Sequence, residues 1–99
     1  MIRHIVIWKL RAEDAAARAR SVAAIAAALE PLAARIGGIR SLTVSPNGAF
    51  FDANWDVVLV GDYDSLAALE AYQSHPDHLA AAAIVRSHVS ERASVDIEL

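Results

Sequence analysis

The chain has 99 residues, a formal net charge of −3 and no cysteine, and 56% of its residues are hydrophobic. This length fits one small domain over residues 1–99, and the lack of cysteine excludes disulfides, thiolate metal sites and cysteine nucleophiles. A net negative charge, without a cluster of Lys and Arg, argues against nucleic acid and membrane surfaces as partners.

The first segment, Ile2–Leu10, is rich in β-branched and aromatic residues and is predicted to be a strand. Its apolar residues occupy both alternating faces, with Val6 and Trp8 on one and Ile5 and Ile7 on the other, which indicates burial on both sides. The segment is too short and too often interrupted by charge for a signal peptide or a membrane span, so we expect a cytoplasmic protein.

An alanine-rich amphipathic helix follows this strand. It opens near Asp14, whose negative charge suits a helix N-terminus, and its apolar residues recur at steps of three and four. Pro31 removes a backbone donor inside this pattern, so we predict a break into two helical pieces near Glu30. The pair Gly37–Gly38 ends the second piece.

Two further strands are predicted over Ile39–Val44 and Trp55–Tyr63, the second again with apolar residues on both faces. The loop between them runs to about Asn54 and carries Phe50 and Phe51. These two aromatic side chains either pack on the domain's own core or serve as a pocket lid or dimer contact.

The remaining chain is predicted to form a broken helix and a last strand. Ser65 supplies an N-cap, and Pro76 disfavours helical geometry at His75, so a second helical piece starts at Pro76 and runs to about Arg86. The segment Ala93–Leu99 alternates apolar and polar residues, as in a half-buried strand.

The resulting order, β-α-β-β-α-β, predicts an α+β, ferredoxin-like fold in which a four-stranded antiparallel sheet carries its helices on one face. The other face is left bare although its residues are apolar. A second copy related by a two-fold axis would cover it, and two such sheets approach a closed barrel. We therefore predict a homodimer through the sheet faces.

Four polar residues are candidates for acid/base chemistry, and each also fits a purely structural role. Pro76 places His78 in the first turn of a helix, where the dipole opposes imidazolium and favours the neutral base. His4 lies on the parity of buried residues and needs a polar partner or a ligand. The phenol of Tyr72 can donate into a pocket, and Asp96 can orient an imidazole or lie exposed.

No metal or cofactor site is expected. His75 and His78 are separated by Pro76, which prevents a regular pair on one helix face, and no third ligand is evident. A glycine-rich phosphate loop and a nucleophile elbow are both lacking.

Four segments together resemble the stress-responsive dimeric α/β-barrel domain family, known as Dabb: Met1–Val6, Tyr63–Leu66, Tyr72–His78 and Val95–Ile97. The Tyr-x-x-His-Pro-x-His motif is the most specific of them, and the resemblance covers the whole chain. It implies a homodimer whose sheets pack into a barrel with the helices outside.

The same motif is similar to that of the cofactor-free polyketide cyclases of the olivetolic acid cyclase type. This resemblance implies that His78 is the general base, that Asp96 orients it, and that Tyr72 and His4 polarise a carbonyl oxygen during an aldol-type closure. The first helix offers no counterpart of the cyclase's helical tyrosine. The resemblance therefore implies a small, polyketide-like or hydrophobic ligand without specifying it.

Three functions remain as hypotheses. A cofactor-independent cyclase or isomerase acting on a small carbonyl-rich substrate requires an apolar pocket that reaches His78. A non-catalytic, stress-associated dimeric binding protein would have a closed core at that position. A cofactor-less monooxygenase, to which Trp8 and His75 point, would consume oxygen with a hydroquinone.

Overall fold

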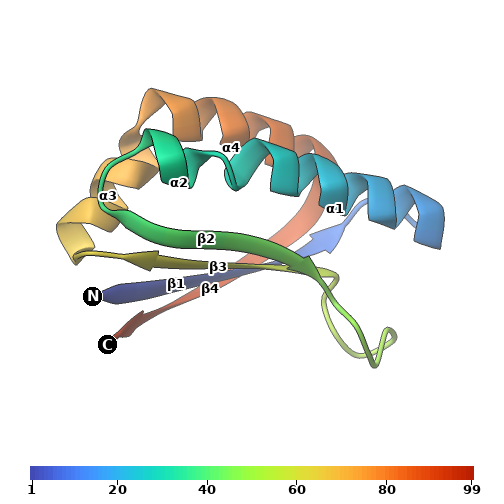
Figure 1. Ribbon diagram of the computed structural model, residues 1–99. Helices are drawn as coiled ribbons and strands as arrows, with labels where there is room; N and C mark the ends of the chain where they lie inside the picture. Colours follow the sequence, from blue (N-terminus) through green and yellow to red (C-terminus); the bar gives the residue numbers. More distant parts are fainter.

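The computed structural model describes all 99 residues and arranges them as a helical layer on one face of a four-stranded sheet (Figure 1). The elements in chain order are β1 Ile2–Leu10, α1 Ala15–Leu29, α2 Leu32–Arg35, β2 Ile39–Pro46, β3 Val57–Tyr63, α3 Leu66–Ser74, α4 Pro76–His88 and β4 Val89–Glu98. The strand order is β2-β3-β1-β4, and all neighbouring strands are antiparallel. The predicted ferredoxin-like βαββαβ fold is confirmed, and none of its helices is long and apolar enough to cross a membrane.

Strand ends differ from the predicted ones where polar residues take part in backbone pairing. β4 begins at Val89, directly after α4, and Glu91 pairs with Lys9 of β1 before the apolar alternation starts. β3 begins two residues later than predicted. The amide of Asp56 still bonds to β1, but its carboxylate accepts from the Leu10 amide at 2.8 Å and ends the regular ladder there.

The first helix begins and breaks where the sequence predicts. The Asp14 carboxylate accepts from the Ala17 amide at 2.7 Å and caps α1. Pro31 separates α1 from α2, and the Glu30 carboxylate at this break accepts from the Val44 amide of β2 at 3.0 Å. This bond fixes the break to the sheet.

The second helical pair turns at His75, which is extended and caps α4. Its ring Nδ1 accepts from the Asp77 amide at 3.0 Å, while Pro76 takes the first helical position. This turn confirms the predicted restart and places His78 in the first turn of α4.

The hydrophobic core lies between the sheet and the helices. The inward side chains of β1 are His4, Val6, Trp8 and Leu10, all buried, and they pack with residues of β3 and of α1 such as Ile25. Every strand of the sheet turns one of its faces toward the helical layer, where this core lies (Figure 1).

The opposite face of the sheet has no covering layer. Its apolar centre consists of Ile5, Ile7, Val58, Val60, Ala93, Val95 and Ile97, which we call the outer patch. Val95 is 61% exposed, so the predicted half-buried strand alternates as expected but turns its apolar residues away from the core of its own chain. At the two ends of the outer patch, ion pairs join Arg3 to Asp62 at 2.8 Å and Lys9 to Glu91 at 3.0 Å.

The loop between β2 and β3 leaves both of its phenylalanines in solvent. Phe50 is 78% exposed and Phe51 is 71% exposed, and Phe50 has a positive φ of 50°. They pack on no core of this chain and do not line its main cavity. The prediction that they pack on the domain's own core is wrong, and the alternative of a pocket lid or a dimer contact stays a prediction.

Candidate active site

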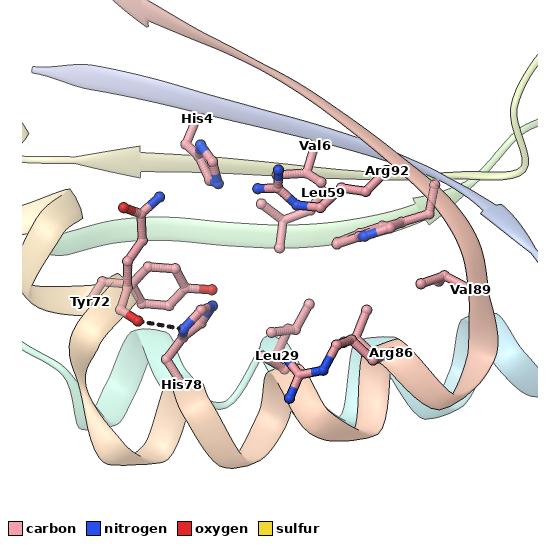
Figure 2. A pocket seen from close by; sticks show the side chains of 13 residues that line it. His4, Val6, Leu29, Leu59, Tyr72, His78, Arg86, Val89 and Arg92 are labelled. Atoms are coloured by element: carbon pink, nitrogen blue, oxygen red, sulfur yellow. Dashed lines mark hydrogen bonds between the residues drawn. The ribbon is translucent and has the colours of Figure 1, made fainter.

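A cavity of about 430 Å³ lies between the helical layer and the sheet. Its walls come from β1, β3, β4, α1, α3 and α4 and are mostly apolar: Val6, Trp8, Leu29, Leu59, Val85 and Val89. Figure 2 shows His4, Tyr72 and His78 together at one end, with Val89 at the other. The sequence therefore brings three of its four predicted site residues to one cavity.

The ring of His78 is held as a neutral base. Its Nδ1 lies 3.0 Å from the backbone carbonyl of Gln73, which can only accept, so Nδ1 carries the proton and Nε2 keeps a free lone pair (Figure 2). Burial is the main cause that lowers the pKa of His78 below its usual value of 6.5, and electrostatic repulsion from His4, Arg92 and Arg86 adds to it, although the Gln73 bond partly opposes this.

Asp96 contacts His4, and the predicted contact between Asp96 and His78 is wrong. The two residues are direct neighbours on β4 and β1, and Asp96 Oδ1 lies 2.5 Å from His4 Nδ1. The antiparallel register puts both side chains on the face that carries the helices, whereas the His78 ring on α4 is already tied to Gln73. Asp96 therefore orients the buried imidazole of β1.

A chain of aromatic rings connects the two histidines. The ring of Tyr72 is centred 4.4 Å from that of His78 and 5.1 Å from that of Tyr63, which in turn lies 6.1 Å from His4. Burial raises the pKa of both tyrosines, so each phenol keeps its proton at neutral pH. The Tyr63 hydroxyl is buried without a hydrogen-bond partner, and a Cβ at Gly61 would meet that ring at 2.8 Å.

Sequence reasoning missed four polar side chains of this region: Tyr63, Gln73, Arg86 and Arg92. Arg86 lies eight residues after His78 on α4, which is about two helical turns, so the helical period could have placed it. Arg92 shares the parity of Asp96 on β4 and could have been found with it. The position of Tyr63 in this region can be seen only in the folded structure.

The other two histidines serve structure. His75 caps α4, and the Nδ1 atom of His88 lies 3.0 Å from the Ser21 hydroxyl of α1. The backbone carbonyl of His88 also accepts from the Arg11 amide at 2.9 Å. No three His, Asp or Glu side chains gather in a metal-binding group.

The arrangement can move protons at a bound ligand. A neutral imidazole with a free nitrogen, a second imidazole supported by a carboxylate and a protonated phenol meet at the end of an apolar cavity. Such a set supplies a base, a group that stabilises developing charge and a hydrogen-bond donor.

Comparison with known proteins identifies the family. A family model described as the stress responsive A/B barrel domain, Dabb, matches residues 2–99. No curated protein matches the chain in sequence. Among solved structures, a dimeric ferredoxin-like protein of unknown function from Bacteroides fragilis is 31% identical, with a TM-score of 0.87 and coverage of 99% of this chain and 95% of that one.

Two more structures are similar. A dimeric ferredoxin-like protein of unknown function from Thermobifida fusca is 27% identical, with a TM-score of 0.78 and coverage of 99% and 90%. A Dabb family protein from Mesorhizobium loti, with a ferredoxin-like fold, is 20% identical, with a TM-score of 0.73 and coverage of 99% and 95%. The match of the family model to residues 2–99 shows that the chain belongs to the stress responsive A/B barrel domain family.

Proposed function

We propose that this protein is a homodimeric, cofactor-independent acid/base enzyme of the cyclase or isomerase type, acting on a small carbonyl-rich compound. One observation carries the proposal: the apolar cavity joins a neutral His78 to a second imidazole that a carboxylate holds. Its volume of about 430 Å³ is that of a small-molecule site.

In the proposed mechanism, Nε2 of His78 takes a proton from the carbon next to a carbonyl group. His4 and Tyr72 lie at the same end of the cavity and stabilise the enolate oxygen that forms. Asp96 fixes the ring of His4 through Nδ1 and favours its imidazolium form, whose Nε2–H donates to the enolate oxygen. In an isomerisation, the proton held by His78 returns to the enolate at a different carbon. In a cyclisation, the enolate carbon attacks a second carbonyl group of the substrate, and the alkoxide that forms takes this proton.

A second copy of the chain on the outer patch completes the proposal. The patch is apolar at its centre and carries ion pairs at its ends, which is the usual anatomy of a protein interface. The similar structures from Bacteroides fragilis and Thermobifida fusca are described as dimeric. Phe50 and Phe51 extend from the same chain as exposed side chains that a partner would cover.

Deuterium exchange tests the chemistry without knowledge of the natural substrate. We expect the protein to accelerate exchange of the α-protons of linear β-diketones and β-keto acids in D₂O, followed by proton NMR. The His78→Asn variant should lose about a hundredfold or more of this rate, because a positioned general base contributes rate factors of that order. His75→Asn is the matched control, since His75 starts the same helix but does not line the cavity.

Other outcomes would favour the other functions. Equal exchange rates for the wild type and His78→Asn, or no acceleration with any compound, contradict the acid/base proposal and favour a binding protein. Because Trp8 lines the cavity beside His4 and His78, a monooxygenase would use the same space. Oxygen uptake with a hydroquinone, giving a hydroxyquinone and water, would support that activity.

A further inference from the structure

Two arginines are the only side chains with a permanent charge that line the cavity. Arg86 comes from α4 and Arg92 from β4, and Figure 2 shows them on opposite walls. None of the 12 acidic residues of the chain lines this space, although the chain as a whole has a net charge of −3. The local charge of the cavity is therefore opposite to that of the protein.

Neither arginine is neutralised within the chain. Three other basic side chains form ion pairs with carboxylates on the surface: Arg3, Lys9 and Arg40. Arg92 reaches only the Ser94 hydroxyl, at 3.4 Å, and Arg86 forms no side-chain hydrogen bond or ion pair. The guanidinium groups keep their donors free for a ligand.

The charges of both arginines also act on the interior of the cavity. Each contributes to the lowered pKa of His78, so their positive fields reach the imidazole that lines the same space. Apart from the polar end at His4, Tyr72 and His78, most of the remaining lining is apolar, with Trp8, Leu29 and Leu59 among the walls. An apolar body with one anionic head matches both features.

We propose that the cavity selects small amphipathic carboxylates, whose head pairs with the exposed guanidinium of Arg86 or Arg92 and whose apolar body lies against β1 and β3. The guanidinium fork suits a carboxylate because it offers paired donors in one plane. The inference rests on the proposed function in taking the same cavity as its site, and it adds the charge of the substrate. Pairing of the head with either arginine leaves the apolar body in the cavity that His4 and His78 also line.

The test compares two probes of equal size and shape, 4-butylbenzoate and 4-butylbenzamide. Their dissociation constants are measured on the full-length wild-type protein by calorimetry, and by the shift of the Trp8 indole NMR signal. We expect the benzoate to bind about tenfold or more tightly than the amide, since charge-assisted hydrogen bonds exceed neutral ones. Added salt should weaken binding of the benzoate alone.

Variants of the two arginines test whether these residues cause the preference for the benzoate. Arg86→Gln and Arg92→Gln should each weaken benzoate binding about fivefold, and the double variant should bind the two probes equally. Arg20→Gln is the matched control, because Arg20 is exposed on α1 and does not line the cavity. Circular dichroism of each variant verifies that the fold is retained.

Equal binding of both probes to the wild type, a preference that survives in the double variant, or no Trp8 shift with either probe would overturn the inference. Loss of the benzoate preference only when the arginines are replaced supports the inference. The His78→Asn variant separates this result from the proposed function: loss of exchange activity with intact benzoate preference supports both. Benzoate preference without any exchange activity in the wild type contradicts the catalytic proposal alone.

Discussion

His4 and His78 carry the same side chain in opposite electrostatic surroundings. His4 has a carboxylate on its Nδ1, whereas His78 has a backbone carbonyl there and positive charges around its ring. Proteins assign acid and base roles to similar groups through such differences in environment. The difference in surroundings therefore assigns proton abstraction to His78 and charge stabilisation to His4 in the proposed mechanism.

The lowered pKa of His78 predicts a pH dependence of stability. The unfolded chain binds a proton at this position near the usual pKa of 6.5, while the folded chain does so only at lower pH. Protons therefore favour the unfolded state in this window, and the free energy of unfolding should fall as the pH drops below about 6.5. Urea unfolding of the wild type and of His78→Asn between pH 7.5 and 5.5 measures the effect. The wild type should lose more stability than the variant, and equal losses would contradict the assignment.

Tyr63 predicts a stabilising substitution. Its buried hydroxyl has no partner, and burial of an unsatisfied polar group costs about 1–3 kcal/mol. Tyr63→Phe should therefore raise the free energy of unfolding by about 1 kcal/mol in urea titrations. Tyr72→Phe, which changes a neighbouring ring in the same way, should have a smaller effect because its hydroxyl is not among the unsatisfied buried groups. A loss of stability in Tyr63→Phe would contradict this prediction and indicate a hydrogen bond with the neighbouring phenol of Tyr72.

At the scale of elements, the turn between α3 and α4 positions the proposed base. The His75 ring takes the place of a usual capping side chain and accepts from the Asp77 amide. His75→Ala should lower the free energy of unfolding by about 1 kcal/mol, and His75→Asn, which can still accept this bond, by less. Thermal or urea unfolding of the two variants measures the difference. Equal stability of both variants and the wild type would show that Pro76 alone starts the helix.

The elements themselves could be predicted because each depends on local periodicity and on caps. The break at Pro31 and the restart at Pro76 follow from backbone chemistry that any fold must satisfy. The start of β4 was missed because Glu91 and Arg92 interrupt the apolar alternation while the backbone continues to pair with β1. The alternation of apolar and polar residues therefore located the strand but not the first residues of it that pair with β1.

The site could be predicted only in part, for a related reason. Strand parity and the Pro76 restart were enough to turn His4 inward and to place His78 in the first helical turn. The partner of Asp96 depends on the register between the first and last strands, which long-range packing sets and no local pattern encodes. The same register brings Arg92 to the cavity, and the strand predicted over Ala93–Leu99 did not include this residue.

At the scale of the whole molecule, the outer patch predicts how the proposed dimer can be separated. Val60→Glu places a charge among apolar residues at the centre of the patch, where burial against a partner would leave it unpaired. We expect the dimer dissociation constant to rise about a hundredfold or more in sedimentation equilibrium. Ala23→Glu adds the same charge on the exposed side of α1 and should leave the dimer intact. A wild-type protein that sediments as a folded monomer at micromolar concentration would contradict the proposed interface.

The direct junction of α4 and β4 has a consequence for the kinetics of ligand exchange. His88 ends the helix, Val89 starts the strand, and the bonds of His88 to Ser21 and Arg11 hold the junction against the rest of the chain. The wall that carries Arg86 and Arg92 therefore contains no loop that could swing aside as a gate. Association should follow a single concentration-dependent phase without a slow conformational step, and the residence time of a ligand should vary with its affinity alone.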